Sequence, residues 1–465
     1  MKEKITFALL FANRGFFPGD VIADARREMC EAVKNAGFEY ICMEESATRY
    51  GAVETIAEGK KYADFLEQNR GIYDGVIVSL PNFGDENGIS VALKNAGVPI
   101  LVQAYPDEIG KMDFARRRDA LCGKFAVCNI LRQMNIPYTL TEKFVIKPDT
   151  AEFAAELYKF GAICRTVKGM KNFNIGAIGA RTTAFKTVRV DEMALAAKGI
   201  NVETIDLSEL FARVRTVSDE DMNNAKERIL GITRFAGYPE EKLNTMAKVQ
   251  VAVESLVRDY DMDAVAIRCW NEFETELGIA PCTTLSLLND MGIAAACEVD
   301  VENAVMMRAL ALAAESASTL LDFNNNYGEE EDKAIMFHCG PVPSSMCEGK
   351  GQVCEHLMFK KTYGDGSGVG VNKTEMKSGN ITIGSVKTEG GKIYAFLTDA
   401  KFTDDPIEKE FFGSGKVVKK DGINEVANYM ATYGYKHHLA VTFGDFKSCI
   451  AEALGKYLGY EVETI

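Results

Sequence analysis

Short apolar runs alternate with amphipathic segments along the first third of the chain. Apolar runs of strand length occupy residues 4–12, 39–43, 73–81 and 98–104. Segments with helical periodicity lie between these runs and continue to about residue 169. Strands and helices that alternate at this spacing are typical of right-handed βαβ units, which build a parallel sheet covered on both faces. The pattern predicts a first α/β domain over residues 1–170.

The same alternation restarts at Asn174 and continues to about residue 343. Strands are expected at 174–179, 201–206, 263–270, 293–297, 318–323 and 333–338. Helices are expected at about 184–199, 218–236, 239–260, 281–291 and 301–316. We therefore expect a second α/β domain over residues 171–343, with its ligand site outside the carboxyl ends of the strands.

From about residue 345 the apolar positions recur with a period of two. Two alternating runs, 379–388 and 392–398, are joined by Gly390-Gly391, and this arrangement predicts a β-hairpin. A further strand is expected at 439–443 within the segment 436–444, and helices at about 423–433 and 445–458. The last domain, over residues 344–465, is therefore expected to be β-rich, antiparallel and barrel-like.

Composition narrows the classes of function. Lys and Arg number 53 against 67 Asp and Glu, and the resulting net charge of −14 argues against a nucleic-acid partner. No apolar run is long enough to cross a membrane, and the short run at 4–12 is expected to be a strand rather than a signal peptide. The twelve cysteines form no CxxC pair, which favours reduced thiols in a cytoplasmic protein. P-loop, GxGxxG and GxSxG motifs are missing, which disfavours ATP use, hydride transfer and serine hydrolysis.

Three of the expected strands end in side chains that bind hard cations or move protons. Glu298 follows the strand 293–297, Asp322 lies near the end of the next strand, and His338 ends the one after it. One strand–helix–strand unit separates Glu298 from Asp322, so the two carboxylates are expected to face each other at one sheet edge. Oxygen and nitrogen ligands of this kind suit Mn²⁺, Mg²⁺, Co²⁺ or Fe²⁺ better than a thiolate-preferring ion.

Each of these carboxylates also has a purely structural explanation. Glu298 would be an exposed polar residue at the end of a strand, since most glutamates are exposed. Asp322 would start the turn at 324–328, and Asp300 would serve only as the N-cap of the next helix. From the residues alone, both explanations stay open.

Strand alternation gives two further expectations around these residues. His437 and His438 precede an apolar strand, and in an extended chain their rings point to opposite faces, so at most one enters a given site. By the same alternation, the side chains of Cys297 and Cys339 are expected to point away from the site.

A set of short motifs recurs in a fixed order. The motifs are Cys269-Trp270, Pro281-Cys282-Thr283, Ala296-Cys-Glu-Val-Asp300, Leu321-Asp-Phe323, Phe337-His-Cys-Gly340 and His437-His438. In this order the chain resembles the L-fucose isomerase / L-arabinose isomerase family, most specifically over 263–345 and at 437–438. The first domain resembles the family in pattern and in Asn13-Arg14-Gly15 after the first strand. The segment after 350 is shorter than in an L-fucose isomerase proper, so the substrate's name is not carried over.

The resemblance implies a chemistry and a set of site residues. It implies a divalent metal, Mn²⁺ first, and interconversion of an aldose and a ketose through a cis-enediol. Glu298, Asp322 and His438 would bind the metal, and the two carboxylates would share the acid and base roles in an unassigned order. His338 matches a ligand of the arabinose branch that the fucose branch lacks. The family forms trimers or hexamers with sites between subunits, so Arg14 would reach a neighbour's site.

Trp270 and His437 complete the expected substrate contacts, although Trp270 would serve equally well packed beneath the pocket. An isomerase acting on a sulfonated or deoxy sugar fits the same residues. Two alternatives of other classes remain, a non-catalytic sugar-binding or sensing protein and a metal-dependent lyase or aldolase. The single Trp of the chain disfavours the sugar-binding protein, which needs aromatic platforms rather than a metal site.

Overall fold

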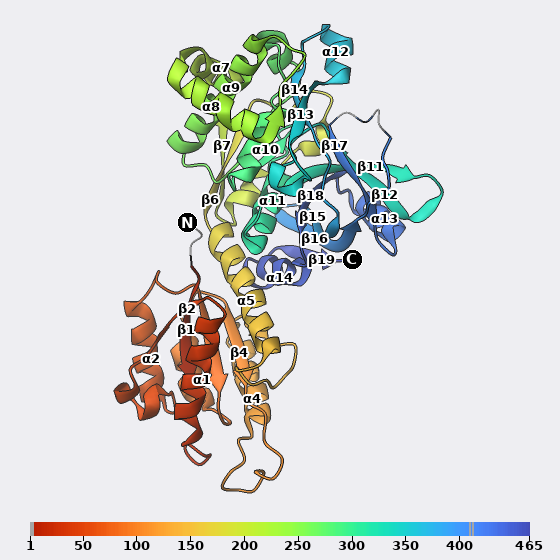
Figure 1. Ribbon diagram of the computed structural model, residues 1–465. Helices are drawn as coiled ribbons and strands as arrows, with labels where there is room; N and C mark the ends of the chain where they lie inside the picture. Colours follow the sequence, from red (N-terminus) through yellow and green to blue (C-terminus); the bar gives the residue numbers. More distant parts are fainter. Residues whose placement is uncertain (1–3, 409–410, 412) are drawn as a thin grey trace. The chain divides into compact units, whose positions relative to one another are not determined.

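A computed structural model describes residues 4–408, 411 and 413–465 (Figure 1). The chain divides into two compact units, one ending at Lys168 and the other comprising Gly169–Ile465. Each unit is described by itself. The finer division into domains at 1–170, 171–343 and 344–465 stays a prediction.

The first unit is a parallel sheet with the strand order β2-β1-β3-β4-β5. Its strands are β1 (Thr6–Phe11), β2 (Glu39–Cys42), β3 (Gly75–Leu80), β4 (Ile100–Ala104) and β5 (Thr139–Leu140). Its helices are α1 (Val21–Asn35), α2 (Ile56–Gln68), α3 (Glu86–Leu93), α4 (Ala120–Gln133) and α5 (Ala151–Met170), the last of which runs across the unit boundary. β3 and β4 are buried along their whole length, as strands covered by helices on both faces must be.

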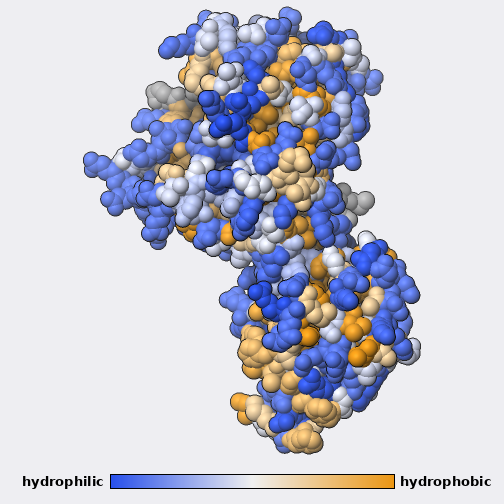
Figure 2. Space-filling view, turned by 180° about the vertical axis from the view of Figure 1, so that it is seen from behind, coloured by the Kyte–Doolittle hydropathy of each residue, from blue (hydrophilic) through white to orange (hydrophobic). Residues whose placement is uncertain are grey.

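The surface of the first unit carries several large apolar side chains. The exposed ones between residues 109 and 125 are Ile109, Met112, Phe114, Leu121 and Phe125. Figure 2 shows apolar patches on one face of this unit among mainly hydrophilic surroundings. Apolar patches of this kind occur at protein–protein contacts, although single exposed apolar residues are ordinary.

The second unit begins with a four-stranded parallel sheet of order β10-β9-β6-β7. Its strands are β6 (Phe173–Ile178), β7 (Ile200–Ile205), β9 (Ala264–Ile267) and β10 (Ala294–Cys297). Its helices are α6 (Glu192–Ala196), α7 (Leu207–Thr216), α8 (Asp219–Ile232), α9 (Glu240–Asp259), α10 (Cys282–Asp290) and α11 (Val301–Ala314). A small sheet of order β14-β13-β8 adds β8 (Thr233–Arg234), β13 (Gly351–Glu355) and β14 (Val369–Lys373).

Helix α11 joins this parallel sheet to the strands that follow. Its sequence, VENAVMMRALALAA, is apolar on nearly every face, and a helix of that kind must be buried all round. It packs against β9 and β10 on one side and against β15 and β18 on the other. Any side chain at its N-terminus therefore lies between the two sheets.

A closed antiparallel barrel completes the second unit. Its strands are β11 (Thr319–Tyr327), β12 (Glu330–His338), β15 (Gly379–Glu389), β16 (Lys392–Phe402), β17 (Ser414–Lys419) and β18 (His438–Phe443), and β19 (Glu461–Thr464) adds to β16. The strand order β15-β18-β11-β12-β17-β16 closes because β16 also pairs with β15. Helices α12 (Leu357–Tyr363), α13 (Ile423–Tyr433) and α14 (Lys447–Glu452) flank these strands. The predicted fold class, parallel α/β sheets followed by a β-rich barrel-like region, is confirmed.

Two sequence expectations about local structure are wrong. The strands expected at 318–323 and 333–338 are not part of the parallel sheet but form the hairpin β11–β12 of the barrel, paired antiparallel. The reason is the two-residue link Gly328-Glu329, since so short a connection permits only antiparallel neighbours. The helix expected over 184–199 is reduced to α6, which begins at the N-cap Asp191, and residues 179–190 before it form a loop with one short 3₁₀ turn.

Candidate functional site

The register of β11 and β18 places two of the predicted site residues opposite each other. Asp322 pairs with His438 across the antiparallel ladder. Directly opposed side chains of such a pair lie on the same face of the sheet with their Cβ atoms close together. Asp322 is therefore near His438 because of barrel pairing, and not because of the βαβ crossover expected from the sequence.

Glu298 reaches the same point from the parallel sheet, in a strained backbone conformation. It follows the last residue of β10, and both Glu298 and Val299 adopt positive φ angles, 60° and 59°. This region is rare for non-glycine residues and especially unfavourable for a β-branched one, so it costs of the order of 1–3 kcal/mol per residue. Such strain persists where the surrounding structure holds it, and here it turns the chain between β10 and the N-cap Asp300.

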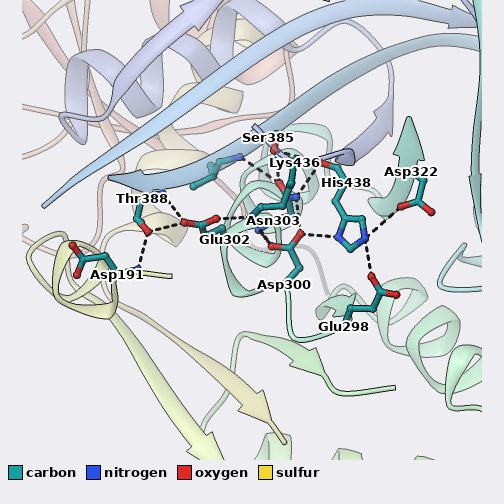
Figure 3. A network of polar contacts seen from close by, with 11 residues as sticks. Asp191, Glu298, Asp300, Glu302, Asn303, Asp322, Ser385, Thr388, Lys436 and His438 are labelled. Carbon is teal, nitrogen blue, oxygen red and sulfur yellow. Dashed lines mark hydrogen bonds and ion pairs between the residues drawn. The ribbon is translucent and has the colours of Figure 1, made fainter. Parts of the chain in front are cut away.

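Both carboxylates are directed at one nitrogen of His438 (Figure 3). His438 Nε2 lies 2.9 Å from Glu298 Oε2 and 3.3 Å from Asp322 Oδ1. Nevertheless, Nε2 and Asp322 Oδ1 are both buried and neither makes a hydrogen bond of good geometry to any described residue. Three ligand atoms that converge without bonding one another are the arrangement a cation needs.

The other ring nitrogen of His438 is fixed by Asp300. His438 Nδ1 donates to Asp300 Oδ2 at 2.8 Å, and the ring is almost completely buried. Burial lowers the pKa of His438, but Asp300 and the adjacent carboxylate of Glu298 outweigh it and raise that pKa to about 10 in the absence of a cation, which would compete with the proton for Nε2. Asp300 is thus the N-cap of α11 and also a partner of His438, so the expectation of a cap alone was incomplete.

His338 stands beside this group but its nitrogens have other partners. One of its ring nitrogens lies within 4.8 Å of the ligand atoms of Asp322 and His438, as a metal ligand would. Yet Nδ1 accepts the backbone N–H of Cys339 at 2.9 Å, and Nε2 lies 3.1 Å from Cys297 Sγ. The assignment of His338 as a ligand stays a prediction.

The cysteines next to these residues do not point away from the site, contrary to expectation. Cys297 Sγ is 3.1 Å from one nitrogen of His338, and Cys339 Sγ is 3.3 Å from the other. Strand alternation failed because β10 ends at Cys297 and β12 ends at His338, and beyond a strand end the alternation no longer holds. Cys282 Sγ lies a further 3.7 Å from Cys339 Sγ.

Aromatic rings line one side of the site. Phe185, in the loop after β6, lies 5.3 Å from the ring of His438, 5.6 Å from His437 and 6.0 Å from Trp270, with which it stacks. Trp270 is half-buried and follows β9, so the wall stands at the carboxyl edge of the parallel sheet. His437 is half-exposed at this wall, which is where a substrate contact would be needed.

Sequence reasoning missed three of the residues gathered here. Phe185 was assigned to a helix, and its place in an uncapped segment before Asp191 was the available signal. Lys436 and Glu302 are buried beside Asp300, and the ammonium group of Lys436 forms an ion pair with each of the two carboxylates. No sequence motif marks them, because their proximity depends on the packing of α11 against β18.

Arg14 belongs to the first unit and has partners there. Its guanidinium lies 2.9 Å from Glu86 and stacks over the ring of Phe83 at 4.1 Å. The prediction that it reaches a neighbouring subunit's site stays a prediction, as do the trimer or hexamer and the cytoplasmic location. No helix in the described part of the chain has the length and apolar character needed to span a membrane.

Two carboxylates and a histidine around one point, beside an aromatic wall, have the chemistry expected of a site that moves protons on a polar substrate. Residues 8–171 match the family model described as "Fucose/sulfoquinovose isomerase, N-terminal domain", and residues 336–465 match "L-fucose isomerase, C-terminal domain". The chain belongs to the fucose isomerase family, and it is an aldose–ketose isomerase, an intramolecular oxidoreductase of carbohydrate metabolism. The resemblance found in the sequence is thereby confirmed.

Curated proteins with the same function name are similar in sequence to this chain over most of its length. A protein named sulfoquinovose isomerase from Alkalicoccus urumqiensis is 26% identical over 404 residues, which cover 83% of this chain and 85% of the relative. Proteins of the same name from Priestia aryabhattai and Clostridium sp. (strain MSTE9) are 23% and 24% identical and cover 88% and 75% of this chain, or 89% and 76% of the relatives. A solved periplasmic solute-binding protein from Actinobacillus succinogenes 130z with bound D-allose matches at 12% identity, over 67% of this chain and 92% of the other. The TM-score of this match is only 0.18.

Proposed function

We propose that this isomerase is metal-dependent and acts on an open-chain monosaccharide through a cis-enediol, with Glu298 and Asp322 as its acid–base pair. The main support for the proposal is that Glu298 Oε2 lies 2.9 Å and Asp322 Oδ1 lies 3.3 Å from the same atom, His438 Nε2. Two carboxylate oxygens around one imidazole nitrogen require a positive charge between them, which either a proton on Nε2 or a metal ion supplies.

The donor set fits a divalent cation of the Mn²⁺ type. Two carboxylates and one imidazole are the ligands that Mn²⁺, Mg²⁺, Co²⁺ and Fe²⁺ accept, and no thiolate is among the three. Glu298, Asp322 and His438 would hold the ion. A bound ion would polarise the carbonyl and hydroxyl oxygens of the sugar and lower the energy of the enediolate.

The chain's own residues supply the proton transfers. In the aldose-to-ketose direction C2 loses a proton and C1 gains one, while the hydroxyl proton leaves O2 and a proton is added to O1. Glu298 and Asp322 would make the transfers at carbon, and positioned acid–base groups contribute about 10²–10⁴-fold each. Phe185 and Trp270 would cover the apolar face of the sugar and exclude water from the enediol.

We propose a sulfonated hexose as the first substrate to test, because the curated relatives are named sulfoquinovose isomerases. An anionic sugar needs cationic or N–H donors near the site. The loop that carries Phe185 contains three cationic residues, Arg181, Lys186 and Arg189, of which Arg181 is half-buried. They are the candidates for that contact.

A panel of free aldoses tests the proposal. The metal-stripped protein is assayed with sulfoquinovose, L-fucose and L-arabinose, with and without added Mn²⁺, and the ketose product is measured. Ketose should form only with a divalent ion, and Glu298→Gln should abolish it at unchanged thermal stability. Full activity after EDTA treatment and gel filtration would overturn metal dependence. Shorter aldehyde products in place of the ketose would instead favour the lyase or aldolase.

A further inference from the structure

Three ionisable side chains that the proposed proton transfers do not use lie directly behind His438. Asp300, Glu302 and Lys436 are all at most 4% exposed. Figure 3 shows them as a row that runs from His438 through Asp300 and Lys436 to Glu302. Burying three charges is expensive unless each is paired and hydrogen-bonded.

Every charged group in this row has its partners. Lys436 Nζ lies 2.9 Å from Asp300 Oδ1 and also contacts Glu302 Oε2. The other oxygen of Glu302 accepts the hydroxyl of Thr388 at 2.6 Å and its backbone N–H at 2.5 Å. Replacing such buried ion pairs with apolar residues is often neutral or stabilising, so a row of this kind calls for a role other than stability.

Asp300 is held as an acceptor on both oxygens. Oδ1 accepts the backbone N–H of Asn303 at 3.1 Å and the ammonium of Lys436, while Oδ2 accepts Asn303 Nδ2 at 2.8 Å. The orientation of the Asn303 amide is itself fixed, because its oxygen accepts the backbone N–H of Val386 at 3.3 Å. The remaining partner of Oδ2 is His438 Nδ1, at 2.8 Å.

These contacts determine which nitrogen of His438 carries the proton. An oxygen that only accepts requires Nδ1–H as the donor, so in the neutral form that binds a metal the lone pair of the ring is on Nε2, which faces Glu298 and Asp322. The backbone carbonyl of His438 also accepts Asn303 Nδ2 at 3.0 Å, so the main chain and the ring are both held by the start of α11.

We propose that Asp300, Lys436 and Glu302 are positioning residues that fix the tautomer and ring orientation of His438 for metal binding. Asp300 holds the ring directly, Lys436 pairs with Asp300 and orients it, and Glu302 holds Lys436 from the other side. The proposal rests on the proposed function, in which His438 is a ligand. Carboxylates that hold ligating histidines in this way typically contribute 10–100-fold to metal affinity.

Direct measurement of Mn²⁺ affinity tests the proposal without an activity assay. The dissociation constant is obtained from the electron paramagnetic resonance of free Mn²⁺ for wild type, Asp300→Asn and Glu302→Gln. An amide at 300 places an NH₂ group against one of the existing donors, so we expect affinity to fall 10–100-fold. Glu302→Gln, one step farther from the ring, should fall less. An Asp300→Asn affinity within twofold of wild type would overturn the proposal.

Asp290→Asn is the matched control. Asp290 also accepts four hydrogen bonds in the second unit, from the backbone and hydroxyl groups of Ser344 and Ser345 at 2.6–3.1 Å. Its replacement should lower the melting temperature and leave Mn²⁺ affinity unchanged. If Asp290→Asn weakens Mn²⁺ binding as much as Asp300→Asn, the effect is general destabilisation and the positioning role is refuted.

The outcomes also separate this inference from the proposed function. Wild type without Mn²⁺ affinity, or His438→Gln with full affinity, would refute the metal site itself. Should Asp300→Asn not fold, ¹⁵N resonances of the four histidines in the Mg²⁺-bound wild type decide, with His438→Gln for assignment. A proton on Nδ1 of His438 supports the proposal, and a proton on Nε2 overturns it.

Discussion

Glu274 lies in a single π-helical turn, Phe273–Leu277, and offers a test of burial energetics away from the proposed ligands. Its side chain is 3% exposed, and neither carboxylate oxygen makes a hydrogen bond of good geometry to a described residue. Burial raises the pKa of Glu274 from 4.5 to about 8, and the backbone N–H groups of Glu274 and Asn271 offset this only in part. The folded protein therefore holds this carboxyl neutral at pH 7.

The magnitude follows from the two pKa values. In the unfolded chain Glu274 ionises above its ordinary pKa of 4.5, whereas the folded chain keeps the proton up to about 8. Between these values the folded state binds more protons, so the free energy of unfolding falls as pH rises. A difference of about 3.5 between the pKa values, at 1.36 kcal/mol each, gives an upper limit of about 5 kcal/mol by pH 8.

Glu274→Gln removes the ionisation and keeps the shape. We expect the variant to be more stable than wild type at pH 8, by about 2–5 kcal/mol, and to differ much less at pH 5. Chemical unfolding in urea at the two pH values measures this, through the shift of the midpoint. Glu276→Gln, an exposed carboxylate of the same turn, is the control and should show no such pH dependence. Equal stability differences at pH 5 and pH 8 would refute the reasoning.

Two further predictions concern catalysis. Asp322→Asn should lower kcat by about 10²–10⁴-fold at nearly unchanged melting temperature, because it removes one acid–base group that stands opposite His438 on the barrel; retention of a tenth of wild-type turnover would contradict it. Phe185→Ala should raise KM about tenfold with a smaller change in kcat, since the ring supplies apolar contact area and no proton; Phe185→Leu should recover part of the loss, and an unchanged KM in the Ala variant would place Phe185 outside the sugar site.

Most of the architecture followed from periodicity, because the strands of parallel sheets and of barrels differ in pattern. The continuous apolar runs of β3 and β4 reflect two covered faces, and the period-two pattern in β15 and β16 predicted an antiparallel hairpin, although the middle of each of these strands is buried on both faces. The exception was the hairpin β11–β12. Its strands are apolar at the barrel core, as parallel strands are, and only the short link Gly328-Glu329 distinguished them.

The sequence pointed to the residues of the candidate site but not to the strands and sheets that bring them together. Glu298 and Asp322 were expected from one sheet, whereas they come from two, and His438 was tied to them only through a family resemblance. The positive φ angles at Glu298 and Val299 have no sequence signature, because the residue types there disfavour them. Phe185 and Lys436 belong to no motif, because their place at the site depends on contacts between segments that are distant in the sequence.

The junction explains why these particular positions meet. A parallel sheet presents its strand ends at one edge, and a barrel presents cross-strand pairs on one face, but neither alone surrounds a point with ligands. Helix α11 is the element that packs against both, and it begins at Asp300, directly after Glu298. Its N-cap carboxylate bonds Nδ1 of His438 on the barrel, on the other side of the ring from the contact that Glu298 makes with Nε2. A shift of the barrel against the sheet would break the Asp300–His438 hydrogen bond before it altered either sheet, so metal affinity should report that packing more sensitively than overall stability does.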